Sequence, residues 1–244
     1  MDDLEASVKK WRKLLGVEGK VDVRIGDNET PPECQASQVP PRIVLPPDSP
    51  EPPLAHEMGH LALAQKYDLC FGQTEIDRRG GADDLFEEQV DIASGCCDLF
   101  VDTKVFAAEP AIVDKYLEYE LDDLKYYQNA IGEIPKNDVI MLMGLYMVAA
   151  LAAVKFEAFG KDMSDVMKGM TASAERTYSP HEANKITRLY DLYKQVPPLG
   201  DDRFEAVRSY RETTQKTARI LGFRVPHLVL SINKDRHLWS KKNK

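Results

Sequence analysis

A run of sixteen residues without a charge, 139–154, constrains this chain most, because so apolar a segment must lie in a protein core or in a membrane. A helix that spans a bilayer needs about 20 such residues. Lys155 and Glu157 end the run early. We therefore expect a helix buried within a helical lobe, with a membrane-embedded chain as the less favoured alternative.

The residues from Asp84 onward show helical periodicity almost throughout. Apolar residues recur at helical spacing in six segments, which are 84–107, 110–131, 137–159, 162–174, 180–195 and 202–221. Ser179 and Glu182 have the S-x-x-E spacing of a capping box, with Pro180 in the first turn. This pattern predicts a mostly helical lobe over residues 108–244, packed on the preceding part of the chain.

The first part of the chain, residues 1–107, has a mixed pattern that predicts strands and loops as well as helices. A helix is expected at 4–15, and strict alternation at 21–25 predicts a half-buried strand. Residues 42–45 predict a second strand, and the prolines on both sides of it favour an edge position. A Pro-rich loop is expected between these strands, a second loop at 67–84 and a last short strand at 228–232. The expected fold class is α+β, with a small sheet and helices in this first unit.

Charge and cysteine content exclude several classes of protein. The formal net charge of −8 and a pI near 5.2 argue against a nucleic-acid surface, which draws on clustered lysine and arginine. The four cysteines show no C-x-x-C spacing and suggest no disulfide framework. The acidic N-terminus lacks the pattern of a secretory signal. A reducing, cytoplasmic location is expected, with no nucleic-acid partner.

Residues 56–60, His-Glu-Met-Gly-His, match the pattern H-E-x-x-H in a segment that two prolines open as a helix. Positions i and i+4 lie about 40° apart around a helix, so both imidazoles can bind one ion. Zn²⁺ prefers such nitrogen ligands and leaves a position for water. The motif predicts that His56 and His60 bind zinc, and that Glu57 is the catalytic base for a water the metal activates.

The third protein ligand is expected to be acidic. The extended pattern H-E-x-x-H-x-x-G-x-x-H is excluded, because Leu63 and Lys66 stand where glycine and histidine are needed. Glu87 and Asp91 have E-x-x-x-D spacing, so Glu87 can bind the zinc while Asp91 accepts a hydrogen bond from a ligand histidine. The polar residues of this helix gather in one stripe, which favours a wet cleft and consists of Glu87, Glu88, Asp91, Ser94, Asp98 and Asp102. Glu88, Glu75 and Asp77 remain alternatives for the third ligand.

HEMGHLAL followed by EEQVDIAS resembles the ImmA/IrrE-type minimal gluzincins, a family of zincin metallopeptidases, over roughly residues 20–107. The resemblance implies a zincin-like unit at 1–107, with Glu87 as third ligand and Glu57 as base. The chain departs from the family at Ala64 and, in the second motif, at Gln89, Ala93 and Ser94. The helical region from residue 110 onward has no match in that pattern.

The expected function is that of a zinc-dependent metallopeptidase, a site-specific cytosolic endopeptidase that hydrolyses a peptide or protein substrate. His181 and Tyr178 are candidates for the donor that stabilises the oxyanion of the tetrahedral intermediate. His181 has a simpler explanation as a first-turn residue of a capping box. The alternative is a catalytically weak scaffold or regulatory protein that keeps the zincin fold and binds partners through the helical lobe.

Overall fold

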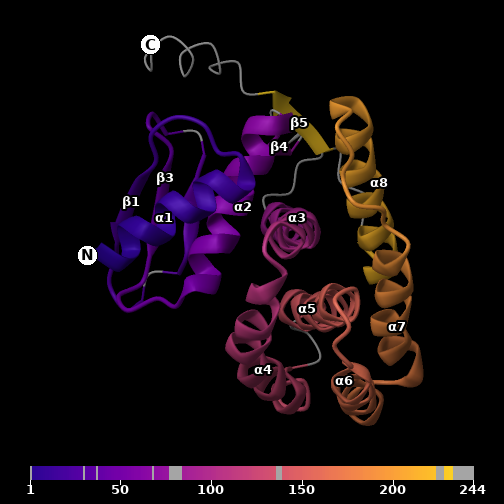
Figure 1. The fold of residues 1–244 in the computed structure, drawn as a ribbon. Coiled ribbons are helices and arrows are strands. Elements are labelled where there is room, and N and C mark those ends of the chain that lie inside the picture. Colours follow the sequence, from indigo (N-terminus) through magenta and orange to yellow (C-terminus); the bar gives the residue numbers. More distant parts are fainter. Residues whose placement is uncertain are drawn as a thin grey trace.

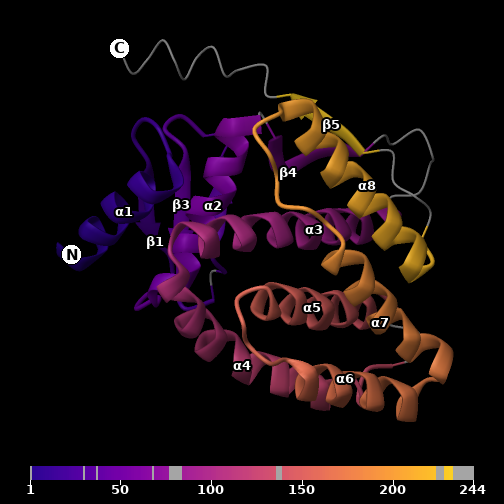
Figure 2. The same cartoon turned by 45° about the vertical axis from the view of Figure 1, so that its right-hand side comes forward.

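The computed structural model describes the backbone of residues 2–29, 31–36, 38–67, 69–76, 84–135, 139–223 and 228–232. Side chains are described for residues 4–29, 31–36, 38–67, 92–135 and 141–223. Two groups of elements meet at one central helix, α3 (Asp84–Ala108) (Figures 1 and 2). α3 contacts α2 (Glu51–Tyr67) on one side, and α5 (Val139–Glu157) and α8 (Arg203–Leu221) on the other. The α+β class and the mainly helical C-terminal region are confirmed.

A three-stranded sheet lies beside α2, on the side away from α3 (Figure 1). Its strands are β1 (Asp22–Ile25), β2 (Glu33–Gln35) and β3 (Arg42–Leu45), in the order β1-β3-β2. β1 runs parallel to β3, and β2 runs antiparallel to it. α1 (Asp2–Leu15) packs on α2 and buries Trp11 completely. β4 (Leu69–Ile76) and β5 (Leu228–Ile232) form a separate antiparallel pair. The expectation of a loop from residue 67 is therefore wrong for β4, because its pairing partner β5 lies far away in the sequence, whereas β5 confirms the predicted last strand.

The expectation that residues 42–45 form an edge strand is wrong, because β3 is the central strand of the sheet. Proline lacks a donor, but its carbonyl still accepts, and the Asp22 N–H donates to the Pro41 carbonyl at 2.8 Å. The flanking prolines therefore bracket the ladder without interrupting it. β2 lies at an edge, in a segment where a loop was expected. Three residues form a strand there because β3 supplies the pairing partner.

The helical region contains α4 (Val113–Ala130), entered through a 3₁₀ turn at Pro110–Ile112, then α5, α6 (Ser164–Thr177), α7 (Pro180–Lys194) and α8. The predicted capping box is confirmed, since the Ser179 hydroxyl accepts from the Glu182 N–H where α7 begins. α5 is buried by its neighbours, with Tyr146 and Phe156 fully covered. Within the described ranges, no helix is both long and apolar enough to cross a membrane.

Candidate metal centre

The helix that carries the H-E-x-x-H motif is buried on almost every face. Leu54, Met58 and Leu61 are at most 2% exposed. Gly59 lies where α2 meets α3, and a Cβ atom there would stand 2.7 Å from a methyl group of Val101 and 3.0 Å from one of Val105. The glycine thus lets the two helices approach closely. This approach places the polar atoms of the motif directly against the acidic stripe of α3.

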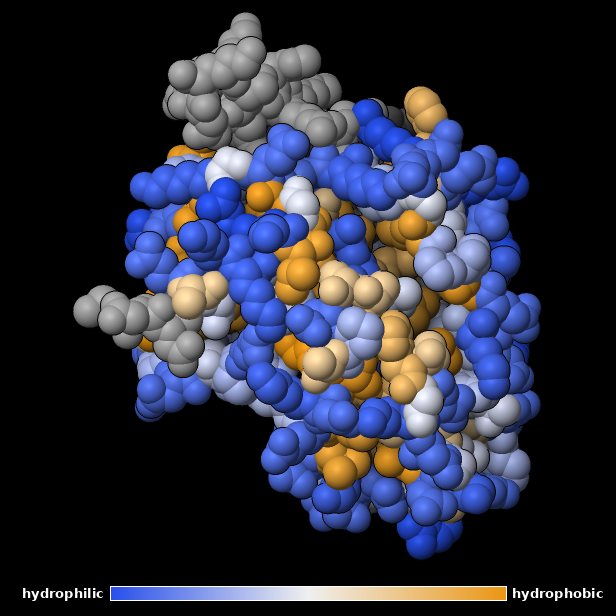
Figure 3. Space-filling model, in the orientation of Figure 1, coloured by the Kyte–Doolittle hydropathy of each residue, from blue (hydrophilic) through white to orange (hydrophobic). Residues whose placement is uncertain are grey.

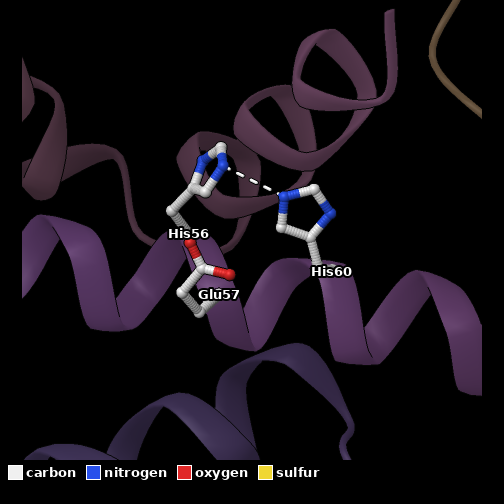
Figure 4. A group of neighbouring side chains, drawn as sticks. All are labelled: His56, Glu57 and His60. Atoms are coloured by element: carbon white, nitrogen blue, oxygen red, sulfur yellow. Dashed lines mark hydrogen bonds between the residues drawn. The ribbon is translucent and has the colours of Figure 1, made fainter. Parts of the chain in front are cut away.

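The two imidazoles converge on one point above α2 (Figure 4). Their Nε2 atoms lie 3.1 Å apart, and the rings meet edge to face with centroids 4.7 Å apart. The side chains of His56 and His60 are 22% and 18% exposed, so the space between them remains accessible to solvent. Two ring nitrogens that face each other need a shared proton or a shared cation between them.

Asp98 on α3 provides a third atom at the same point. Its Oδ1 lies 3.3 Å from Nε2 of His60 and 3.5 Å from Nε2 of His56. Zinc bound tetrahedrally at 2.0–2.2 Å has ligand atoms roughly 3.3–3.6 Å apart. Glu57 also brings an oxygen into a group with both histidines, with all ligand atoms within 4.8 Å of one another. The shorter distances favour Asp98 as the third ligand and leave Glu57 beside the metal position.

Asp102, one turn further along α3, holds His56 in a defined orientation. Its Oδ1 lies 2.8 Å from Nδ1 of His56. Burial opposes ionisation of Asp102, but Lys155 and His56 outweigh it and lower the pKa of this carboxyl. An ionised carboxylate only accepts hydrogen bonds, so Nδ1 of His56 carries a hydrogen, and in the neutral imidazole the lone pair is on Nε2. This is the form in which an imidazole binds a metal.

Lys155, from α5, completes this arrangement. Its ammonium group donates to Oδ2 of Asp102 at 2.8 Å and to Glu120 of α4 at 2.5 Å, and only 9% of the residue is exposed. Burial would lower the pKa of Lys155, but the two carboxylates raise it. The lysine that ends the charge-free run of the sequence therefore pairs with Asp102, the residue that contacts His56. The helical region is joined to the site by a buried chain of ion pairs.

The electrostatics of the centre favour a bound cation. Burial opposes the charged form of His56, yet Asp102 and Asp98 raise its pKa well above the usual value. Burial likewise opposes the charge on Asp98, and the two imidazoles nevertheless lower the pKa of that carboxyl. The carboxylates of Glu57, Asp98 and Asp102 thus lie around the imidazoles. The nearby cation Lys155 is paired with Asp102 and Glu120. Positive charge between the rings is stabilised, whether a proton or a metal ion provides it.

Glu57 lies beside the imidazoles with its carboxylate near His56 (Figure 4) and is 6% exposed. Burial raises the pKa of its carboxyl above 4.5, while the two histidines oppose that rise. A carboxylate with a raised pKa is a stronger base, which suits a group that must accept a proton from water.

Cys97 was not expected at the site, and its sulfur lies 3.4 Å from Nδ1 of His60. Burial raises the pKa of Cys97 well above its usual value, so this residue remains a neutral thiol. This contact at Nδ1 orients the His60 ring so that its Nε2 faces His56 and Asp98. Each ligand histidine therefore has its own orienting contact on α3.

The other predicted site residues have different outcomes. The side chains of Glu87, Glu88 and Asp91 lie outside the described residues, as do all of Asp77 and the side chain of Glu75. Tyr178 and His181 lie at the junction of α6 and α7, on the far side of α5 from α2 (Figures 1 and 2). The Tyr178 hydroxyl lies 2.9 Å from the carbonyl oxygens of Ile131 and Ile134, and His181 is exposed. Neither residue belongs to the cluster around His56.

Sequence reasoning missed the roles of Asp98, Asp102, Lys155 and Cys97. A usable signal was present, because Asp98 and Asp102 repeat the four-residue spacing of Glu87 and Asp91 on the same polar stripe. The two pairs are separated by eleven residues, about 16 Å along a helix axis. No sequence signal was available for Lys155, because its partners Asp102 and Glu120 lie 53 and 35 residues away in the chain.

Comparisons with protein-family models, with curated proteins and with solved structures give no match.

Proposed function

We propose that this chain is a zinc-dependent metallopeptidase that binds its metal through His56, His60 and Asp98. The observation that carries this proposal is the convergence of two Nε2 atoms and one carboxylate oxygen at 3.1–3.5 Å from one another. Two imidazoles and one carboxylate are a common ligand set for catalytic zinc, which keeps a fourth position for water or substrate. Asp98 here takes the place that the sequence assigned to Glu87.

Each neighbouring residue then has a part in peptide hydrolysis. Bound zinc supplies Lewis acidity, which polarises a carbonyl and brings the pKa of water to about 7. Glu57 accepts the proton of the attacking water and returns it to the leaving amine, so the peptide bond breaks with one water consumed. Asp102 holds the His56 ring, and Lys155 holds Asp102. Burial, and then the charges of the neighbouring acids, raise the pKa of Tyr116, whose buried hydroxyl has no hydrogen-bond partner within the described part of the chain.

The position of β2 supports a peptide as the substrate. This strand pairs with β3 on one side and contacts α2. Glu33 of β2 also contributes to the raised pKa of Glu57, which indicates that the strand lies near the base. An edge strand can pair with an extended peptide through main-chain hydrogen bonds and so fix a scissile carbonyl near the metal. We therefore infer that the substrate peptide pairs with the edge strand β2.

Cysteine chemistry is consistent with action in a reducing compartment such as the cytoplasm. The cysteines with described side chains, Cys34, Cys96 and Cys97, are not in disulfide bonds. Cys96 and Cys97 are fully buried, where oxidation would disturb the packing.

Metal analysis combined with proteolysis tests the proposal. The purified protein should hold about one Zn²⁺ per chain and cleave casein or an unfolded protein, and His56→Ala should lose both properties. Zinc without cleavage on a broad peptide library would favour the alternative of a non-catalytic scaffold. Absence of zinc even after metal is added back would contradict the proposal.

A further inference from the structure

A cavity of about 240 Å³ adjoins the metal centre between α3 and α5. Its walls are mostly apolar and include Ile92, Met143, Met147, Leu151 and Phe223. Asp98 is both a wall of this cavity and a member of the metal centre. We call this space the α3–α5 pocket.

One face of α5 forms both the pocket and the ion pair that supports the metal centre. Met143, Met147, Leu151 and Lys155 follow one another at intervals of four residues, which places them along one side of a helix. Lys155 meets Asp102, and Leu151 and Met147 line the pocket beside Asp98. The pocket therefore begins where the charged network ends, and it extends along α3 toward Ile92.

The opposite wall is also set by local structure. Gly222, with φ of 95°, ends α8 in the left-handed conformation, and the Phe223 N–H then donates to the Ala218 carbonyl at 2.9 Å. This turn directs the chain back so that Phe223 lines the pocket. Figure 3 shows apolar side chains gathered near the middle of the face where α3 and α5 lie in Figure 1. Val148 lines the pocket and is 38% exposed, so the apolar lining continues to the surface of the protein.

The size of the pocket fits one large side chain. A cavity of about 150 Å³ is enough to hold benzene, whereas pockets for drug-sized ligands begin at about 300 Å³. The methionines at 143 and 147 are flexible and polarisable, so they can adapt to aliphatic or aromatic shapes. The polar side chains of the lining are Ser94 and Asp98, and the Asp98 carboxylate is directed at the two imidazoles, so the rest of the lining offers no partner to a charged side chain.

We propose that the α3–α5 pocket binds the side chain of the substrate residue next to the scissile bond and selects leucine, methionine or phenylalanine there. This inference rests on the proposed function and adds its substrate class. Asp98 connects the pocket with the proposed metal site. A peptide whose carbonyl reaches the metal position therefore has its neighbouring side chain beside the same aspartate. The helical region thus determines specificity, while α2 and α3 provide the metal site.

Amino-acid hydroxamates test the pocket without requiring turnover, because the hydroxamate group binds zinc and the side chain samples the adjoining space. We expect leucine and phenylalanine hydroxamates to bind the zinc-loaded full chain about ten- to a hundredfold more tightly than glycine hydroxamate, the gain expected for burying one such side chain.

Gly144 lines the pocket, and a Cβ atom there would meet no atom within 4 Å. Gly144→Leu should fill the space, abolish the preference and keep the zinc. Leucine also favours a helix more than glycine does, so the variant should remain folded.

The matched control is Met141→Phe, which adds bulk on the same helix at a residue that is 51% exposed and outside the lining. It should retain the full preference. Equal affinity of the wild type for all three hydroxamates, or an unchanged preference in Gly144→Leu, would overturn the inference while leaving the proposed function intact. The wild type could prefer the larger hydroxamates, lose that preference in Gly144→Leu, and yet cleave no peptide. This result would support side-chain binding in the pocket and contradict the peptidase assignment. Failure of every hydroxamate to bind would contradict both.

Discussion

α2 and α5 are two buried helices of similar length, 17 and 19 residues, and they contribute to the same centre in opposite ways. α2 holds His56, Glu57 and His60 within five consecutive residues, so its chemistry is visible as a motif. α5 contributes Lys155 and a row of apolar side chains, and none of these forms a recognisable pattern by itself. The comparison teaches that a local motif reveals a candidate metal-binding pair of histidines, whereas the orientation of His56 depends on a residue far away in sequence.

Removing the base from α2 should have the largest effect. Glu57→Gln keeps both histidines and Asp98, so zinc content should remain near one per chain. Activity should fall at least about 10²-fold, because general-base catalysis contributes on the order of 10²–10⁴. Peptide cleavage and metal content measured on the same sample check this. A variant within a few-fold of wild-type activity would place the base elsewhere.

Removing the cation from α5 should affect both stability and metal binding. Lys155→Met leaves Asp102 and Glu120 buried without their partner, which should cost about 3–5 kcal/mol in the free energy of unfolding. Zinc affinity should fall about 10–100-fold, because Asp102 then holds His56 less firmly. Lys161→Met is the matched control, since Lys161 pairs with the largely exposed Asp114 and should contribute less than about 1 kcal/mol. Equal effects of the two substitutions would show that α5 does not support the centre.

The buried carboxyl of Glu57 on α2 should make the stability of the protein depend on pH. The pKa of Glu57 is raised in the folded protein from its ordinary value of 4.5, so the folded state binds more protons than the unfolded state between these two values. This residue therefore lowers stability as pH rises through that window, and the loss persists above it. In zinc-free protein, Glu57→Gln should be more stable than the wild type at pH 7, with the difference disappearing below about pH 4.5. Denaturant titrations at both pH values check this smallest effect, and a variant less stable at pH 7 would contradict it.

Much of the fold could be predicted because its signals are local. The helical segments, the strands at 21–25 and 42–45, and the capping box at Ser179 follow from periodicity and from residue types at the helix ends. The position of β3 could not be predicted in this way, because a strand becomes central only when partners pair on both sides. β2 was missed for the same reason, since its three residues depend on β3.

The third ligand of the site could not be predicted from the sequence, because it also depends on packing between helices. The four-residue spacing of two acids occurs twice on α3, at Glu87 with Asp91 and at Asp98 with Asp102. Spacing alone does not decide between the pairs. The decision depends on how far α3 slides along α2, and the close contact of Gly59 with Val101 and Val105 sets that register. Packing between the helices therefore places Asp98 beside both imidazoles, which is the basis for proposing it as the third ligand.

Zinc stoichiometry of four proteins tests this central claim most directly: the wild type, Asp98→Ala, Glu87→Ala and Glu88→Ala, each confirmed as folded by circular dichroism. We predict about one Zn²⁺ per chain in the wild type and in both glutamate variants, and loss of the metal in Asp98→Ala. Retention of zinc by Asp98→Ala together with its loss in Glu87→Ala would contradict the assignment and restore the third ligand inferred from the E-x-x-x-D spacing.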